Sequence, residues 1–239
     1  MKTLISEDMK VGEIVAQNYD TAGILKKHGL DFCCGGGKTL KEACAKNSLN
    51  PDEILEELSE LLDNKAAEGS DFNRWSPEHL IDYIVDRHHS YVKRKTGEIK
   101  IFAEKVAMVH GSTYPENIEI FQLFNELASE MSSHLESEET SAFPLIKTIY
   151  EKRLSGQEVD PRLISELREI LEEMELEHEQ AGSLMKKIRK LSHDFTPPED
   201  ACMTYRVLYH DLQAFEEDLH RHVHLENNIL FEKAVKLVA

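Results

Sequence analysis

Two short patterns in the second half of the chain place a carboxylate four residues after an imidazole. They are His134-x-x-x-Glu138 and His222-x-x-x-Glu226. Residues four apart share one face of an α-helix, so each pair presents two side chains to the same point. Imidazole and carboxylate groups are common ligands of divalent transition metals. One such pair occurs by chance in an acidic helix, but two of them at buried positions indicate a metal site.

The segments that carry these pairs have the apolar periodicity of helices packed in a bundle. Helix-start signals such as Ser76-Pro77 and Asp160-Pro161 open the segments, and the joints between them are short, which favours antiparallel neighbours. The sequence therefore predicts an all-α protein with an up-down four-helix bundle. The four helices are expected at about 76–109, 115–153, 160–192 and 199–236.

Each of the four segments interrupts its apolar stripe with a histidine near its middle. Midpoints meet at one level in an up-down bundle, so four imidazoles and two carboxylates should converge in the core. Two buried carboxylates without partners would cost on the order of several kcal/mol, a cost that a pair of divalent cations removes. The mixed nitrogen and oxygen set suits iron and leaves coordination positions open for water, oxygen or nitric oxide. The expected ligands are His89, His134, Glu138, His178, His222 and Glu226.

Other interpretations of these residues compete with this one. A single histidine on an apolar stripe is more often a hydrogen-bonded core residue, a reading that four histidines at matching depth disfavour. His88 adjoins His89 and could replace it, although the spacing favours His89. Ferritin-like di-iron proteins use Glu-x-x-His, which Glu175-Leu176-Glu177-His178 and Glu217-Asp218-Leu219-His220 match. The second of these strings lies off the buried stripe, so we prefer the histidine-rich set.

The first part of the chain predicts a separate small unit. Residues 1–63 are expected to form a small helical domain, 64–75 a polar linker, and 76–239 the bundle. Short helices at about 10–19, 21–28, 39–47 and 51–62 surround a glycine-rich loop that contains Cys33 and Cys34. Two thiols beside glycines should be sterically open and could receive iron or exchange electrons. A flexible loop with incidental cysteines explains the pair equally well.

Composition and charge limit the expected partners and cellular location. The formal net charge of −17 disfavours nucleic acids and anionic membranes as partners. The apolar runs are far too short to span a bilayer and no signal peptide is evident, so we expect a cytoplasmic protein with free thiols.

Several motifs resemble those of one known family over essentially the whole chain. Asp31-Phe32-Cys33-Cys34-Gly35-Gly36 resembles its N-terminal domain, and Ser132-Ser133-His134, with Glu138-Glu139 and then Phe143-Pro144, resembles its second-helix motif. Glu177–Gly182 and His222–Phe231 resemble the motifs of the third and fourth helices. The family is that of the repair-of-iron-centres (RIC) proteins, hemerythrin-like di-iron proteins with an N-terminal Cys-Cys domain. This chain departs from the family pattern at Ala142, at Glu232 and at the additional Gly37.

This resemblance implies the same six ligands, with His89 chosen over His88, and two iron ions in an oxo- and carboxylate-bridged di-iron centre. It implies repair of iron–sulfur clusters damaged by nitrosative or oxidative stress, by iron donation, by nitric oxide handling, or by both. The partners would be damaged iron–sulfur proteins or an assembly scaffold, with nitric oxide or oxygen as small ligands. The resemblance leaves the oligomeric state open, and a homodimer through the cysteine-bearing unit is a separate hypothesis.

Three other functions remain open from the sequence. The first is hemerythrin-like binding or sensing of oxygen or nitric oxide, and the second is nitric oxide reduction. No NAD, flavin or haem motif is present, so a reductase would take its electrons from a partner. The third is a purely structural bundle without metal.

Overall fold

The computed structural model describes residues 5–64 and 72–238. These residues are mainly helical; apart from one isolated bridge between Lys10 and Thr39, they contain no β-structure. The all-α prediction is confirmed. No helix in the described ranges is both long and apolar enough to cross a membrane. The chain divides into two compact units, Met1–Leu80 with Val223–Ala239, and Ile81–His222.

The first unit contains the short helices that the sequence predicts. They are α1 (Val11–Gln17), α2 (Thr21–Lys27), α3 (Leu40–Asn47) and α4 (Pro51–Asn64), followed by the 3₁₀ turn η1 (Phe72–Arg74). Gly29, with φ +68°, follows the end of α2. A capping box starts α3, because Thr39 Oγ1 accepts from the Glu42 amide while the Glu42 carboxylate accepts from the Thr39 amide.

The expected linker falls largely on residues 65–71, which lie outside the described residues. The division into 1–63, 64–75 and 76–239 therefore stays a prediction. One feature of the structure was not predicted. Residues from Val223 onward belong to the same compact unit as the N-terminal helices, whereas the preceding part of their own helix belongs to the second unit.

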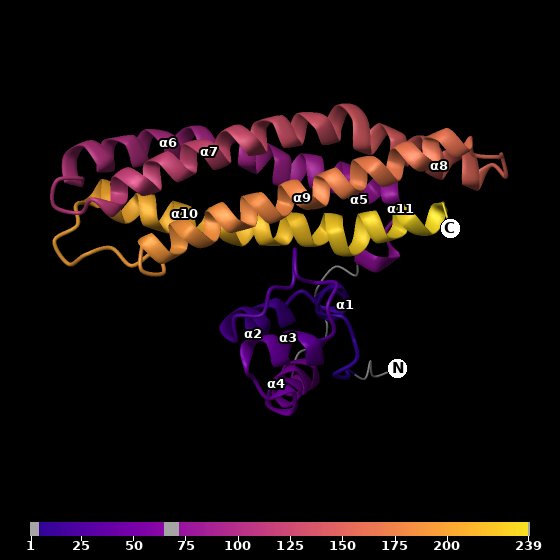
Figure 1. Cartoon of the computed structure of the whole chain (residues 1–239), viewed down its shortest axis with the longest axis horizontal. Helices are drawn as coiled ribbons and strands as arrows, with labels where there is room; N and C mark the ends of the chain where they lie inside the picture. Colours follow the sequence, from indigo (N-terminus) through magenta and orange to yellow (C-terminus); the bar gives the residue numbers. More distant parts are fainter. Residues whose placement is uncertain (1–4, 65–71, 239) are drawn as a thin grey trace. The chain divides into compact units, whose positions relative to one another are not determined.

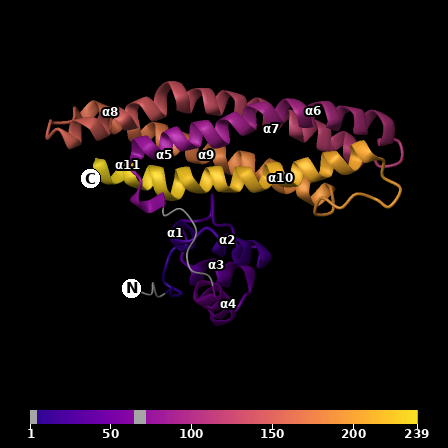
Figure 2. The ribbon, with the colours of Figure 1, turned by 180° about the vertical axis from the view of Figure 1, so that it is seen from behind.

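Four long helical stretches lie close to the predicted ranges, and three of them are interrupted by a π-helical segment. Figures 1 and 2 show α6, α7 and α9 running alongside one another, and α6 and α9 each pack against α7. The stretches are α5–η2–α6 (Pro77–Tyr83, Ile84–His89, Ser90–His110), α7–η3–α8 (Glu116–Ser137, Glu138–Ala142, Phe143–Leu154), α9 (Pro161–Leu191) and α10–η4–α11 (Met203–Leu225, Glu226–Phe231, Glu232–Leu237).

The π-helical segment η3 changes which residues of its helix face the core. The α-helical periodicity predicts that Ser141 and Leu145 continue the buried stripe of His134 and Glu138. That prediction is wrong, because Ser141 is exposed and Leu145 is only half-buried, whereas Ala142 and Ile146 are fully buried. A π-helical turn closes over one more residue than an α-helical turn, so the buried face moves on by one position.

Aromatic side chains fill the core of the second unit. Phe124 from α7 and Phe215 from α10 are both fully buried, and their rings meet edge to face with centroids 5.5 Å apart. Such a pair combines a large buried area with favourable ring geometry, so it makes a large contribution to stability.

Replacing Phe124 by alanine tests this packing. We expect Phe124→Ala to lower the free energy of unfolding by about 3–5 kcal/mol, since it removes a buried ring and leaves a cavity. Urea unfolding followed by circular dichroism measures the change. Ile101→Ala is the control, because the Ile101 side chain is 66% exposed and should contribute about 0.5 kcal/mol or less. Equal effects of the two substitutions would contradict the described core.

Candidate metal centre

All six predicted ligands are buried. His89 ends η2, His134 lies in α7, Glu138 begins η3, His178 lies in α9, His222 lies in α10, and Glu226 begins η4. The most exposed of them, His134, has only 3% of its surface accessible, and Glu138 and Glu226 have none. Fully buried carboxylates are rare unless they are paired or bind a metal ion.

Among the described residues, two groups of side chains could hold a metal ion. The first is His89, Glu138, His222 and Glu226, and the second is His134, Glu138, His178 and Glu226. In each group the ligand atoms lie within 4.8 Å of one another. Glu226 follows His222 by one turn along a continuous helix. The two glutamates belong to both groups, which is the arrangement expected of carboxylates that bridge two ions.

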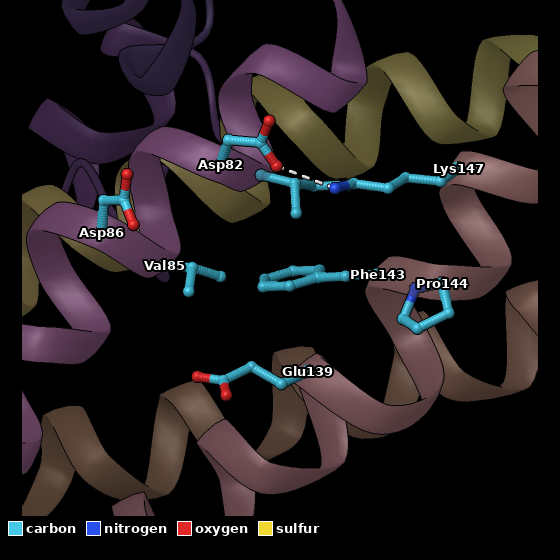
Figure 3. Close-up of a pocket in the computed structure, with 8 residues that line it drawn as sticks. Asp82, Val85, Asp86, Glu139, Phe143, Pro144 and Lys147 are labelled. Carbon is cyan, nitrogen blue, oxygen red and sulfur yellow. Dashed lines mark hydrogen bonds and ion pairs between the residues drawn. The ribbon is translucent and has the colours of Figure 1, made fainter.

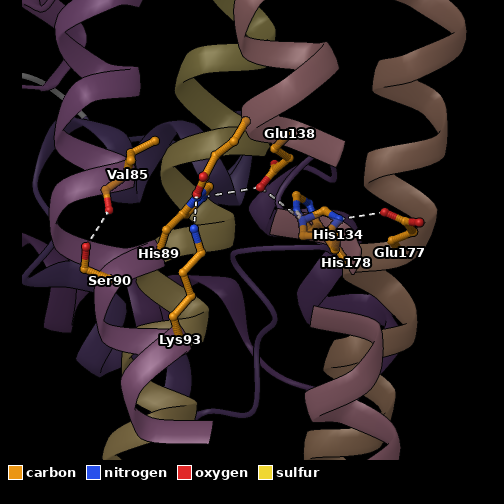
Figure 4. A network of polar contacts seen from close by, with 9 residues as sticks. Val85, His89, Ser90, Lys93, His134, Glu138, Glu177 and His178 are labelled. Atoms are coloured by element: carbon orange, nitrogen blue, oxygen red, sulfur yellow. Dashed lines mark hydrogen bonds and ion pairs between the residues drawn. The ribbon is translucent and has the colours of Figure 1, made fainter. Parts of the chain in front are cut away.

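The distances between these ligand atoms fit coordination of a cation. Glu138 Oε2 lies 3.4 Å from His89 Nε2 and 3.4 Å from His134 Nε2, and Figure 4 shows it between the two rings. His134 Nε2 and His178 Nε2 lie 2.9 Å apart. Metal–nitrogen bonds of about 2.1 Å at right angles place neighbouring donors about 3 Å apart. The residues present therefore fit a metal ion.

Two further glutamates orient the imidazoles of this site. The Glu139 carboxylate lies 2.7 Å from His89 Nδ1, and the Glu177 carboxylate lies 2.6 Å from His134 Nδ1. A carboxylate that accepts from Nδ1 fixes the tautomer in which Nε2 keeps its lone pair, and this is the usual arrangement around metal-bound histidine. In Figure 4 Glu177 approaches His134 from the side opposite Glu138.

Lys93 supports the first of these contacts. Its ammonium lies 2.7 Å from the same Glu139 oxygen. Burial raises the pKa of Glu139, but the hydrogen bonds from Lys93 and His89 outweigh it, so that the pKa lies below its ordinary value. Glu139 is therefore held as a carboxylate.

The roles of Glu139 and Glu177 were not predicted from the sequence. Both residues stand beside a predicted ligand in the sequence, but their partners are on other helices, 50 and 43 positions away. Their positions in the sequence, just off the buried stripe, could have indicated these roles. A carboxylate at such a position can reach Nδ1 of a histidine on a neighbouring helix.

The structure also separates the candidate ligands from their competitors. His88 is buried, but its Nδ1 faces Asp218 at 3.0 Å and it belongs to neither group. Glu175 and Glu217, which the ferritin-like pattern requires, are both exposed. The histidine-rich arrangement is therefore the one that the bundle brings together.

A cavity of about 530 Å³ adjoins His89 in the second unit. Phe143, which lines it, stacks on the His89 ring with centroids 5.6 Å apart, and Glu139 lines it as well. Among the further lining residues, Figure 3 shows Asp82 from α5, Asp86 from η2, and Lys147, which donates to Asp82 at 2.8 Å. The Phe143 side chain therefore separates this cavity from the candidate metal ligand His89.

Cys33 and Cys34 are thiols in a tight loop, with their sulfur atoms 3.9 Å apart. The expectation that both are sterically open is wrong for Cys33, which is buried, while Cys34 is half-buried. Asp31 organises the loop, because its carboxylate accepts from the amides of Cys33 and Gly35. The hydrogen bond with Cys34, together with burial, raises the pKa of Cys33 well above its ordinary value.

The same loop is bonded to the helix that carries Glu226. Asn228 in η4 donates to the carbonyl oxygens of Phe32 and Cys33, each at 3.2 Å. A Cβ atom on Gly36 would come within 2.5 Å of Asn228 Oδ1, so this close approach requires glycine. His224, which is buried, packs its ring against Phe32 with centroids 6.0 Å apart.

Comparisons with known proteins agree with this arrangement. Residues 80–234 match the hemerythrin HHE cation binding domain, and residues 7–62 match a domain of unknown function, DUF542. The iron–sulfur cluster repair protein ScdA of Staphylococcus haemolyticus is 31% identical over 96% of this chain and 99% of its own length. A probable iron–sulfur cluster repair protein of Haemophilus influenzae is 33% identical over 95% of this chain and 96% of its own. YtfE, the repair protein of Pectobacterium carotovorum, is 33% identical over 96% and 97% of the two chains.

The fold and the buried cluster define a hemerythrin-like cation-binding protein. More narrowly, the chain belongs to the family of iron–sulfur cluster repair proteins that join this domain to an N-terminal Cys-Cys domain.

The outer carboxylates give a prediction about metal affinity. Glu139→Gln and Glu177→Gln should each weaken metal binding about 10–100-fold, because an amide supports the donating histidine less well than a carboxylate does. Competition with a chromophoric chelator measures the affinity. The matched control is Glu136→Gln in α7, the helix that continues into the η3 segment of Glu139, since Glu136 is exposed. Unchanged affinity in the first two variants would show that these contacts do not act on the metal site.

Proposed function

We propose that this protein carries a di-iron centre and serves the repair of damaged iron–sulfur clusters. The observation that supports it is the buried cluster of four histidines and two glutamates, in which both carboxylates belong to both candidate metal groups. Two ions of like charge so close together need shared anionic ligands, and Glu138 and Glu226 would supply them. Mixed nitrogen and oxygen ligands suit iron.

The residues of the chain would divide the work at this site. His89 and His222 would bind one ion, His134 and His178 the other, and Glu138 and Glu226 would bridge them. Glu139 and Glu177 hold the His89 and His134 rings in place. Bound iron would supply redox chemistry and coordination positions for a small ligand such as nitric oxide or oxygen, and the cavity beside Phe143 would give such ligands room close to His89.

The relatives support the assignment to repair. Three proteins that match over nearly their whole length carry iron–sulfur cluster repair in their names. By that likeness, the clients of this chain would be iron–sulfur proteins whose clusters have lost iron or been nitrosylated.

Cys33 and Cys34 would take part in repair as free thiols. Burial and the contact between the two sulfur atoms hold Cys33 as a thiol at neutral pH. The half-buried Cys34 is the sulfur of the pair that a client could reach first.

Metal content tests the shared role of the glutamates. Glu138→Ala should remove nearly all bound iron, because both candidate groups lose a ligand, whereas His178→Ala should retain roughly half of it. Elemental analysis gives iron per chain, and Mössbauer spectra distinguish a coupled pair from a single ion. The chelated protein should also unfold at a lower temperature than the iron-loaded protein. Equal iron content in the two variants would contradict the two-ion arrangement.

Repair activity itself is tested with a nitrosylated iron–sulfur enzyme as the client. Iron-loaded protein should restore the client's activity, and Glu138→Ala should not. The double variant Cys33→Ser, Cys34→Ser separates the two parts of the proposal: retained iron with lost repair would give the thiols a role, while retained repair would exclude one. Failure of the fully loaded protein to restore any activity would overturn the proposed function.

A further inference from the structure

A second thiol site lies apart from the candidate metal centre, where α6 ends and α10 begins. Cys202 is exposed, and its sulfur lies 3.3 Å from Nε2 of His110, the last residue of α6. This cysteine is therefore not isolated: it stands within proton-transfer distance of a base. Cys33 and Cys44, by contrast, are buried.

Cys202 also lies immediately before the first residue of a long helix, α10. Its carbonyl oxygen accepts from the Arg206 amide at 3.1 Å, and α10 runs for 23 residues from Met203. The amides at the start of a helix and the helix dipole favour negative charge there.

The surroundings hold both members of the pair in place. The His110 ring packs on Tyr205, with centroids 5.3 Å apart, and the buried Tyr205 hydroxyl accepts from Asn117 at 2.7 Å. On the other side, the Arg206 guanidinium donates to the carbonyl oxygens of Ala201 and Glu199, at 3.1 Å and 2.7 Å. A nucleophile and a base that are both fixed before reaction need little reorganisation.

The loop before α10 has one more anchor. Tyr114 donates to Asp200 at 2.7 Å, two residues before Cys202. The segment that leads to the thiol is thus bonded to the turn that follows α6, the helix that carries His110.

From this geometry we propose that Cys202 and His110 form a nucleophilic thiol–imidazole pair that reacts with disulfides of small thiols. His110 Nε2 takes the proton of the Cys202 thiol as the sulfur attacks the disulfide. A bond forms between Cys202 Sγ and one sulfur of the disulfide, the original sulfur–sulfur bond breaks, and the released thiolate takes the proton from His110. The Cys202 sulfur is oxidised, and the departing sulfur is reduced by the same two electrons.

The test uses oxidised glutathione and the full-length protein at neutral pH. Peptide mass spectrometry gives the rate at which the mixed disulfide forms at Cys202. His110→Gln should slow this reaction about tenfold or more, because it removes the base. His210→Gln is the matched control, since the His210 side chain is 80% exposed and lies in α10, about two turns after Cys202. An unchanged rate in His110→Gln would overturn the proposal.

A second measurement does not depend on any variant. Cys202 in the unsubstituted protein should react faster than the cysteine of an unstructured peptide with the sequence of residues 199–206. Circular dichroism of His110→Gln would reveal unfolding of that variant, and in that case the comparison with the peptide decides. A rate no greater than that of the peptide would also overturn the proposal.

Discussion

The structure depends on one constraint: two carboxylates and four imidazoles share the interior of a helical bundle. Glu138 and Glu226 are fully buried and belong to the same two groups of ligand atoms, which span no more than 4.8 Å. Two negative charges at that distance repel by about 3–4 kcal/mol at an effective dielectric of about 20. The ammonium of Lys93 is bonded to Glu139, which belongs to neither group. A metal ion bound at the cluster would balance this charge, and the apolar stripes would then pack around a neutralised centre.

The π-helical segments show how the backbone meets this constraint. Three segments, η2, η3 and η4, each contain a candidate ligand at one end: His89, Glu138 and Glu226. A regular α-helix would keep the apolar stripe and the ligands on one fixed face, whereas a π-helical turn lets the helix present the ligand and then continue its core packing one position later. Ala142 and Ile146 are buried beyond Glu138 for that reason. Such segments are often found at functional sites, because the backbone gives up regular hydrogen bonding there.

Much of this arrangement could be predicted from residue types and spacing. The apolar periodicity of residues 199–236 predicts one buried face that includes Leu212, Phe215 and His222, and all three are buried. Periodicity is the strongest signal that a long amphipathic helix carries. Ser141 and Leu145 were misplaced because a π-helical turn changes the phase without changing the composition.

The outer carboxylates and the cysteines were harder to predict for a different reason. Glu139 and Glu177 act across helix pairs, and the exact rotation of two helices about their axes cannot be obtained from one sequence. The burial of Cys33 also depends on residues far away in the sequence. Adjacent glycines predict an open loop, but here Asn228 donates to the Cys33 carbonyl oxygen and His224 packs on Phe32, both from positions nearly 200 residues away.

Within the first unit, the cysteine loop is bonded to the helical segment that begins at Glu226. Glu226, a candidate bridging ligand, lies between His224 and Asn228 in the sequence. Both of these neighbours contact the loop, His224 through Phe32 and Asn228 through the Phe32 and Cys33 carbonyl oxygens. A Cβ atom on Gly36 would also come within 2.5 Å of the Phe32 carbonyl oxygen, so the loop needs glycine at this position. The turn of helix that supplies the carboxylate and the loop that supplies the thiols are therefore packed as one piece, and a change in one is opposed by the contacts of the other.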